Sequence, residues 1–491
     1  MSDRTSLRSR ALLTAILLGI LADLLVRVSG RPGLSFALWA AIGVASLYML
    51  SRDRGEPVSR ESEMLVGGAL LFTVLLVVRD ADSLAAFSIL AAIGLLTLAA
   101  GRAATAWLGN ANVSDAVFAG ARVALLCAAG PIGWGRGEPV PAEPGRGGWQ
   151  RQALTVVRGV AMALPVLLVL GALLMSADPV FARIVQDIFR IDIEPLVEHL
   201  LFIAILAWLS AGFLRAILVR DTALQAIPRV PQPGFAPAEI SVALWVVNLL
   251  FILFMAVQLR YLFGGADIVQ LTPDLSYADY ARKGFFELIL ATALVVPVLL
   301  VADWAAAPGE TRARSMLRST MLVLILLLVG VITSAVYRMR LYQDAYGLTE
   351  QRLNASVFMA WITILLVWLG FTVLRGRREK FVAGAVAAAA VCVLALYAMN
   401  PHAVIARVNL DRAASGAEYD GDYITSLSAD AVPTFLSRMS QLSEEERCRA
   451  GSELIRRWSG EREGGWRTWN LSDWRARRAV RGRIAELRCS T

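Results

Sequence analysis

Several catalytic signatures and reactive side chains are missing from this sequence. It has no Gly-x-x-x-x-Gly-Lys-Ser/Thr phosphate-binding loop and no Gly-x-Ser-x-Gly nucleophile elbow. Cys-x-x-Cys and His-Glu-x-x-His are also absent, and the chain has only 2 histidines and 4 cysteines. Because the common zinc sites need more of these ligands, a zinc enzyme is not expected, nor is an ATP-driven pump or a serine hydrolase. We expect no metal and no cofactor, and the absences favour a protein that is not an enzyme.

Lysine is nearly absent as well. Of the 48 basic residues, only Lys283 and Lys380 are lysines. This preference for arginine, together with abundant alanine and glycine, indicates a GC-rich bacterial genome. No basic stripe interleaved with aromatic residues precedes the C-terminal tail. The net charge of +8 is therefore interpreted as a sign of membrane topology, and no nucleic-acid partner is expected.

Hydrophobic sequence is what the chain has in abundance. Hydrophobic residues make up 57% of it and the mean hydropathy is +0.58, above the range of soluble globular chains. A helix needs roughly 20 apolar residues to cross the hydrocarbon layer of a bilayer. The sequence therefore predicts an all-α fold, a polytopic bundle of about eleven transmembrane helices in the lipid bilayer. The predicted spans are 11–26, 33–50, 63–78, 83–100, 155–175, 197–217, 239–259, 284–302, 316–336, 354–374 and 381–398.

The distribution of arginine predicts how this bundle is oriented. Every second loop is rich in basic residues, whereas the loops between them are poorer in arginine and often acidic. By the positive-inside rule, the N-terminus is cytoplasmic and the C-terminal region is external, in a bacterial cytoplasmic (plasma) membrane. The basic residues of the richer loops are Arg52, Arg54 and Arg60; Arg102, Arg136, Arg146 and Arg151; Arg215, Arg220 and Arg229; Arg312, Arg314 and Arg318; and Arg375, Arg377, Arg378 and Lys380.

Composition divides the chain into four parts. Residues 1–129 form an N-terminal unit of four helices, followed by a segment at 103–129 that is expected to be interfacial or re-entrant. The apolar core of that segment is too short to span. Residues 130–150, dense in glycine and proline, form a cytoplasmic linker. A seven-helix unit at 151–399 and an external α-helical tail at 400–491 complete the chain.

The tail carries clear helix-start signals. Ser443 and Glu446 have the spacing of a capping box and predict a helix that runs to about Trp458. Ser472 with Asp473 predicts the start of a second, arginine-rich helix. Two interpretations of the tryptophans are open: they form a small core, or they lie at the membrane interface beside a basic face that contacts anionic lipid. These tryptophans are Trp458, Trp466, Trp469 and Trp474.

The cysteines separate by environment. Cys127 and Cys392 fall in apolar segments and are expected in the core. Cys448 and Cys489 both lie in the tail, where an oxidising compartment permits a disulfide between them. The alternative is a pair of free thiols, which would contradict the external placement of the tail.

Two polar stripes near the external ends of the helices predict a ligand pocket. Polar side chains inside membrane spans are costly and are therefore candidates for function. One stripe precedes and enters the eighth helix, and the other ends the ninth. A carboxylate, guanidinium groups and phenols together suit a polar headgroup, a sugar or a proton relay. The alternative is a girdle of salt bridges and aromatic rings that fixes helix register. The predicted pocket residues are Glu287, Tyr280, Lys283, Arg338, Arg340, Tyr342 and Tyr346.

Three further polar residues near the ends of spans are less informative. Glu198 and His199 at the start of a helix are expected to anchor it at the interface. Asp23 in the first helix either packs through hydrogen bonds or faces an internal cavity, and the sequence does not separate the two.

Four short stretches resemble a bacterial multi-pass membrane family. That family is catalogued as a domain of unknown function, number four-one-seven-three. The resemblance covers roughly residues 150 to 480 and is weaker in the first four helices. It implies an integral membrane protein of bacteria, and it implies no activity, cofactor or catalytic residue. The stretches are YADYARKGFFELI (277–289), YGLTEQRL (346–353), NPHAVIARVNL (400–410) and DYITSLSADAVP (422–433).

Three functional hypotheses follow from the sequence. The first is a protein that binds or moves a small polar or lipid-like ligand at the external pocket. The second is an envelope signalling or scaffold protein that docks partners, as yet unknown, through the tail. The third is a membrane enzyme that acts on a lipid-linked substrate with Glu287 as its base.

Overall fold

The fold is helical throughout the part of the chain that the structure describes. The computed structural model describes residues 2–27, 32–53, 59–101, 113–135, 170–171, 174–179, 193–218, 233–263, 285–308, 310–417, 420–460 and 465–488. In these ranges there is no strand, only an isolated bridge between Phe235 and Ala306. The predicted all-α class is confirmed.

Long apolar helices dominate the fold. Within the described residues, nine are long and apolar enough to cross a membrane, namely α2, α4, α5 with η4, α8, α10, α13, α14, α15 and α16. This confirms a polytopic bundle. The helices before the C-terminal tail are α1 (Ser2–Leu25), α2 (Leu34–Asp53), α3 (Arg60–Leu75), α4 (Asp82–Gly101), α5 (Val113–Ala129), the 3-10 helix η4 (Gly130–Gly135), α8 (Ile193–Leu218), α10 (Pro237–Phe263), α13 (Phe285–Ala305), α14 (Thr311–Tyr346), α15 (Glu350–Thr372), the short turns η5 (Val373–Arg375) and η6 (Arg378–Lys380), and α16 (Phe381–Met399).

The predicted spans match these helices with three differences. Helices α1 and α3, both predicted to span, are not among the nine, and α3 has only 16 residues. The predicted span 155–175 falls almost entirely outside the described residues. Helix α5 is longer than expected, because it continues through residues that the sequence reading treated as interruptions.

Helix α5 lies beside the end of α4 and the middle of α8. Gly101, the last residue of α4, lies against Ala119, and Gly130, the first residue of η4, lies against Trp208 of α8. The indole nitrogen of Trp208 donates to the carbonyl oxygen of Ala128 at 2.9 Å. Residues Val113–Ile132 are long and apolar enough to cross a membrane, so the expectation that this segment is too short to span is wrong. Its interfacial or re-entrant placement stays a proposal.

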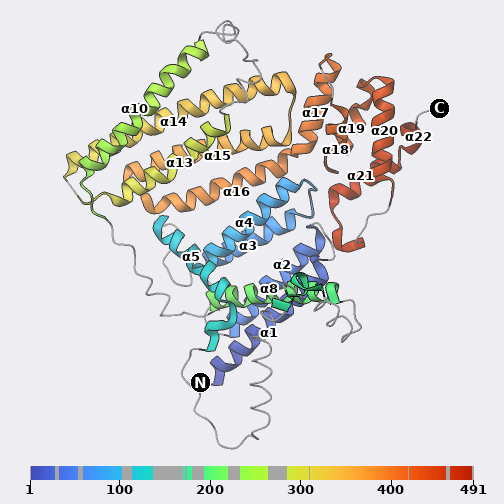
Figure 1. The fold of residues 1–491 in the computed structure, drawn as a ribbon, viewed down its shortest axis with the longest axis horizontal. Helices are drawn as coiled ribbons and strands as arrows, with labels where there is room; N and C mark the ends of the chain where they lie inside the picture. The colour runs from blue at the N-terminus through green and yellow to red at the C-terminus, as the bar shows by residue number, and fades with distance from the viewer. Residues whose placement is uncertain are drawn as a thin grey trace, which may run out of the picture.

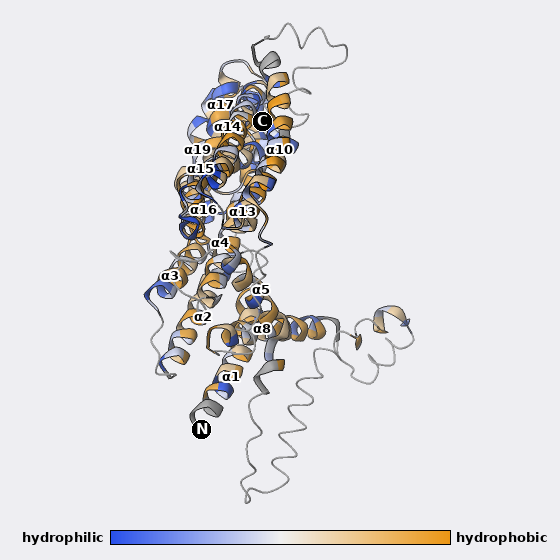
Figure 2. Ribbon diagram, turned by 90° about the vertical axis from the view of Figure 1, so that its left-hand side faces the viewer, coloured by the Kyte–Doolittle hydropathy of each residue, from blue (hydrophilic) through white to orange (hydrophobic). Residues whose placement is uncertain are grey.

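The helices form two groups joined by a pair. Figure 1 shows α10 and α13–α16 in one group and α1, α2 and α8 in another, with α3 and α4 between them. Phe72 and Leu95 of this pair pack against Val386 and Ala390 of α16. Apolar residues dominate α8, α10 and α13 along their length (Figure 2). Helix α8, from the predicted second unit, packs on α1 and α5 of the first, so helices of both units share one bundle.

One end of the bundle carries basic residues where α13 meets α14. Arg378 lies 3.9 Å from Asp303, and Arg314 donates to the carbonyl oxygen of Ala307, both at the end where α13 stops and α14 starts. At the other end lie the C-terminus of α14, the start of α15 and the end of α16. We call this second end the C-terminal face. Helix α14 has 36 residues, which is roughly 54 Å at about 1.5 Å per residue, so it projects beyond a hydrocarbon layer about 30 Å thick.

The C-terminal helical domain packs on a core of its own at this face. Its core includes Ile405, Phe435, Leu454, Trp458 and Val480. Its helices are α17 (Pro401–Ala414), α18 (Gly421–Ser426), α19 (Val432–Arg438), α20 (Glu444–Trp458), α21 (Leu471–Arg481) and α22 (Ile484–Leu487), with the 3-10 turns η7 (Met439–Gln441) and η8 (Gly465–Thr468). Figure 1 shows this domain beside the ends of α14–α16 and of α3 and α4.

The predicted helix starts in this domain are close to those observed. Ser443 and Glu446 form a capping box, and the helix ends at Trp458. The second helix begins at Leu471, one residue earlier than expected, because the side chain of Asn470 caps it by accepting the N–H groups of Ser472 and Asp473. Trp458 is buried in the core, whereas the other three tryptophans are exposed.

The cysteines differ in their bonding state. Cys127 and Cys392 are free and half-buried, whereas the core was expected for both. Cys448 is disulfide-bonded. Cys489 lies outside the described residues, so its pairing with Cys448 stays a prediction.

We expect peptide mapping without reduction to recover one linked species that contains Cys448 and Cys489, because only an oxidised pair in the tail resists alkylation. Cys127 serves as the control and should be alkylated after denaturation without reductant. Alkylation of Cys448 under the same conditions would contradict the pairing.

A glycine permits the close approach of α1 and α8. A Cβ atom at Gly19 would lie 2.5 Å from the carbonyl oxygen of Ile203 and 2.9 Å from the Cβ of Ala207. Small residues of this kind let membrane helices pack backbone to backbone. We expect Gly19→Ala to force the helices apart and to destabilise the protein by about 1–3 kcal/mol, seen as a lower unfolding temperature in detergent. Gly94→Ala is the matched control, since nothing lies within 4 Å of that site; an equal loss in both variants would refute the explanation.

Candidate functional site

Glu287 and Arg338, one from each of the two predicted polar stripes, lie in different surroundings. Arg338 is buried, and its Nη2 donates to Oε1 of Gln258 on α10 at 2.5 Å. Ser334 donates to the same oxygen at 3.3 Å. Glu287 is exposed in the first turn of α13, in line with the exposed Leu290 one turn later. The two stripes therefore do not meet in the described residues.

Of the remaining members of the predicted pocket that the structure describes, only Tyr342 and Tyr346 are in contact with each other. Arg340 is exposed on α14, and Tyr280 and Lys283 lie outside the described residues. Tyr342 and Tyr346 do come together, with ring centroids 5.3 Å apart. The guanidinium of Arg352 lies 4.0 Å from the Tyr342 ring centroid and 5.9 Å from that of Tyr346. Arg352 was not among the predicted pocket residues, although it lies in the stretch YGLTEQRL.

Two arginines cap the end of α14 at this place. The last carbonyl groups of a helix lack partners within the helix. Arg352 donates to the carbonyl oxygens of Tyr346 and Gly347, at 3.0 and 2.5 Å. Arg412 of α17 donates to those of Asp344 and Ala345. The end of α14 is thus held by one residue of α15 and one of the C-terminal helical domain.

The turn between α14 and α15 is fixed by the same domain. Asn409 pairs with the backbone of Leu348, donating to its carbonyl oxygen at 2.7 Å and accepting its N–H at 2.8 Å. Gly347 has a φ of 75°, and a Cβ there would lie 2.4 Å from Oδ1 of Asn409. A glycine is therefore required by both the backbone conformation and the close contact.

A pocket of about 1040 Å³ opens beside this turn. Its walls come from the end of α14, the start of α15, and helices α17, α18 and α20. Tyr346 is the only predicted pocket residue that lines it in the described part of the chain. Its charged residues are the arginines Arg352, Arg412, Arg449 and Arg456 and the acids Asp420, Asp422, Glu446 and Glu453.

The pocket has as many acidic as basic residues. Arg456 donates to Glu453 at 2.5 and 2.8 Å, and this hydrogen bond lowers the pKa of Glu453, which keeps it a carboxylate. Tyr423 accepts the N–H of Glu350 at 2.9 Å, and burial raises the pKa of its hydroxyl. The pocket thus presents guanidinium groups, carboxylates and neutral phenols to a ligand.

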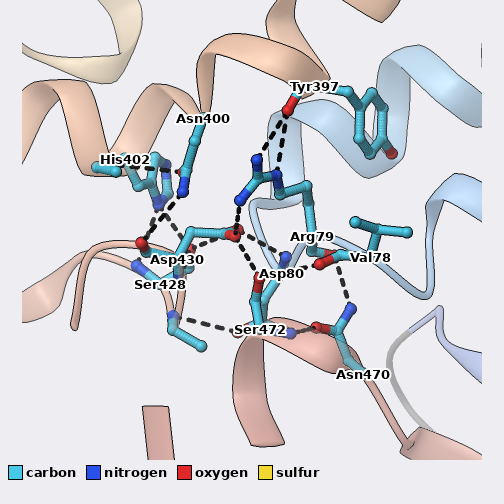
Figure 3. Close-up of polar contacts among 12 residues, drawn as sticks. Val78, Arg79, Asp80, Tyr397, Asn400, His402, Ser428, Asp430, Asn470 and Ser472 are labelled. Atoms are coloured by element: carbon cyan, nitrogen blue, oxygen red, sulfur yellow. Dashed lines mark hydrogen bonds and ion pairs between the residues drawn. The ribbon is translucent and has the colours of Figure 1, made fainter. Parts of the chain in front are cut away.

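Below this pocket, a buried carboxylate joins the C-terminal helical domain to the bundle (Figure 3). The side chain of Asp430 is 1% exposed and lies 3.4 Å from the guanidinium of Arg79, in the loop between α3 and α4. Its other oxygen accepts the N–H of Asp80 at 2.7 Å. The hydroxyl oxygen of Ser472 in α21 lies 2.5 Å from Asp430 and 2.9 Å from the carbonyl oxygen of Val78, so its single proton is shared between these two acceptors.

Further contacts surround this carboxylate. Arg79 also donates twice to the carbonyl oxygen of Tyr397, at 3.0 and 3.2 Å, near the end of α16. Asn400 there has a φ of 57°, ends α16 and caps α17 by accepting the N–H of Ala403. Asparagine tolerates this left-handed conformation better than most residues. Its amide also donates to the carbonyl oxygen of Asp430 at 3.4 Å.

His402 links the network to α15. Its Nδ1 accepts the backbone N–H of Ser428 at 3.1 Å. This bond requires a lone pair on Nδ1, so the neutral ring carries its proton on Nε2, which lies 3.3 Å from a carboxylate oxygen of Glu350. The imidazole therefore bridges the domain and the first turn of α15, a role for His402 that sequence reasoning missed.

The polar residues of α1 and α8 form a separate cluster. His199 contacts both carboxylate oxygens of Asp23 at 2.7 and 2.8 Å, and Arg27 lies 3.6 Å from Asp23 and also contacts Glu198. Of the two interpretations of Asp23, hydrogen-bonded packing is the one that these contacts fit. The cluster ties the end of α1 to the start of α8.

Three of the four quoted stretches meet at the C-terminal face. Residues 346–353, 400–410 and 422–433 contribute the α14–α15 turn, the start of α17, and α18 with the loop to α19. Residues 277–284 of the fourth stretch lie outside the described residues. The stretches that carry the family resemblance therefore pointed to this site. They do not include its partner residues, which are Arg79, Asp80, Asn470 and Ser472.

The helices and the domain at their ends define a multi-pass integral membrane protein. The chain belongs to the family described as Domain of unknown function (DUF4153), whose sequence profile matches residues 66–437. A family of unknown function was expected, and the number inferred from the resemblance, four-one-seven-three, is wrong. The match also begins earlier and ends sooner than the expected 150 to 480. No curated protein and no solved structure matches the chain.

We expect Asp430→Asn to loosen the C-terminal helical domain. Removing one partner of a buried ion pair costs about 3–5 kcal/mol, because it leaves the other charge uncompensated. Hydrogen exchange in α19 and α21 should become faster, while the core of α14 stays protected. The matched control is Asp411→Asn, whose pair with Arg438 is exposed and is worth about 0–1 kcal/mol. Equal exchange in the two variants would rule out the attachment role.

Proposed function

We propose that this protein binds a small polar ligand in the pocket at the C-terminal face, held jointly by the membrane bundle and the C-terminal helical domain. The observation that carries the proposal is the composition of the walls. Residues of the α14–α15 turn form one side, and residues of α17, α18 and α20 form the other. A ligand in this position contacts both parts of the protein at once.

The chemistry of the walls favours a ligand that carries both signs of charge. Arginine binds carboxylate or phosphate groups through paired hydrogen bonds. The acids of the pocket suit an amine or another cation, and Asp422 is exposed with no side-chain partner among the described residues. A zwitterionic compound or the charged end of a peptide matches this lining better than an apolar ligand does.

The position of the pocket favours binding over transport. Substrate sites of transporters lie near the middle of the membrane, often at broken helices. This pocket lies instead beyond the end of α14, which is longer than the hydrocarbon layer requires. Glu287, the base in the enzyme hypothesis, has no polar partner among the described residues. The binding hypothesis is therefore preferred to the other two.

The orientation that we propose places this pocket outside a bacterial plasma membrane. Arg314 and Arg378, which belong to the basic loops and are described by the structure, lie at the opposite end of the bundle, and the positive-inside rule assigns such an end to the cytoplasm. The disulfide at Cys448 supports the same orientation, because disulfides persist outside the reducing cytosol. An envelope signalling role is compatible with it, since a ligand that contacts both parts would also act on how they are joined.

Native mass spectrometry of the protein in nanodiscs made from its host membranes tests the proposal. A bound mass should appear on the wild type and be lost from Asp422→Asn and Tyr346→Ala, because losing one polar or aromatic contact in the pocket weakens binding by about tenfold. Glu444→Gln is the control, since Glu444 is exposed in the first turn of α20 and does not line the pocket. Identical spectra for the wild type and both pocket variants would overturn the proposal.

A further inference from the structure

Three tryptophans of the C-terminal helical domain are exposed next to the ends of two bundle helices. Trp466 is 54% exposed, Trp469 39% and Trp474 45%, whereas Trp458 in the core is 5% exposed. Tryptophan is seldom left in water in this way, and several exposed rings in one short segment mark an interaction surface. The segment runs from η8 into α21.

This segment is fixed to the bundle by backbone hydrogen bonds. The N–H of Leu34, at the start of α2, donates to the carbonyl oxygen of Trp469 at 3.2 Å. The N–H of Leu471 donates to the carbonyl oxygen of Val77, just after α3, at 2.8 Å. A Cβ at Gly33 would lie 3.2 Å from the backbone of Thr468. The tryptophans are therefore held beside the start of α2 and the end of α3.

The bundle surface next to this segment is apolar. Leu71 and Val74, in the last two turns of α3, and Leu38, in the first two turns of α2, are exposed large hydrophobic residues. Because α2 is long and apolar enough to cross a membrane, this side of the bundle is expected to face lipid. The exposed rings thus continue a lipid-facing surface at the depth where the apolar layer gives way to headgroups, which is where tryptophan is enriched in membrane proteins.

Arginines accompany the rings. Arg467 lies 5.5 Å from the Trp466 ring centroid and Arg478 lies 5.3 Å from that of Trp474. Arg475 and Arg478 are exposed and make no hydrogen bond or ion pair among the described residues. The acid nearest in sequence, Asp473, is buried and paired with Arg477 at 3.0 Å. The surface is therefore both aromatic and cationic.

We infer that η8 and the start of α21 form a membrane-contact surface that inserts its tryptophans among lipid headgroups and binds anionic phospholipid through its arginines. The occupant is the bilayer that holds the bundle, because the surface is continuous with the lipid-facing side of α3 and its charge complements an anionic headgroup. This function is independent of the ligand pocket. The surface would attach the C-terminal helical domain to lipid, whereas the buried contact at Asp430 attaches the domain to the bundle.

Depth-dependent quenching tests the insertion. The protein is placed in nanodiscs whose lipids carry bromine near the headgroup, and tryptophan fluorescence is compared with that in unlabelled lipid. Because the chain has 13 tryptophans, the quenching of each ring is obtained as the difference between the wild type and the variant that lacks that tryptophan. Trp466→Phe, Trp469→Phe and Trp474→Phe should each remove part of the quenching, and Trp458→Phe should remove none. If quenching in all three exposed variants equalled that of the wild type, the inference would be overturned.

Lipid retention tests the charge. In nanodiscs of phosphatidylcholine and phosphatidylglycerol, native mass spectrometry gives the ratio of the two lipids that stay bound. The Arg475→Gln/Arg478→Gln variant should lower the retained phosphatidylglycerol by about fivefold or more. The control is Arg447→Gln/Arg488→Gln, because both arginines are exposed and lie in α20 and after α22, outside η8 and the start of α21. Retention equal to that of the control would show that the surface does not select anionic lipid and would overturn the inference.

Discussion

The attachment of the C-terminal helical domain depends on one buried carboxylate. A charge removed from water is tolerated only when it is paired and hydrogen-bonded. Asp430 meets this condition only where the domain meets the bundle, because Arg79 and the N–H of Asp80 come from the α3–α4 loop and the hydroxyl of Ser472 comes from α21. Separating the two parts would leave Asp430 without the guanidinium of Arg79 and the N–H of Asp80, and Arg79 without a carboxylate. The domain is therefore positioned on the bundle rather than tethered to it by the chain alone.

That position makes the pocket possible. The end of α14 projects past the membrane, and its last carbonyl groups need donors that the helix cannot supply. Arg352 and Arg412 supply them, and Asn409 fixes the following turn. The same contacts that satisfy a helix end thus bring α15 and α17 together and leave a polar cleft between them. In the function that we propose, the same few arginines would hold the helix end and contact the ligand.

Most of the fold could be predicted from periodicity and composition, and the site could not. The long apolar runs define the helices because every backbone group in a membrane must be satisfied within its own segment. The capping box at Ser443 was predicted correctly because it is a local signal. The stripe of Arg338, Tyr342 and Tyr346 was correctly placed on one helix, but spacing does not say which neighbour it faces. Arg338 faces α10, whereas Tyr342 and Tyr346 face Arg352.

Composition and local patterns were sufficient to predict the class of this protein, the approximate ends of most helices and the location of a polar domain after residue 400. These features depend on interactions within a few turns of chain. The pairing of Arg79 with Asp430, hundreds of residues away, and the exposure of three tryptophans while Trp458 is buried follow from the packing of the helices. Such contacts arise from how helices stack, and side-chain identity alone does not encode which distant surface a residue will meet.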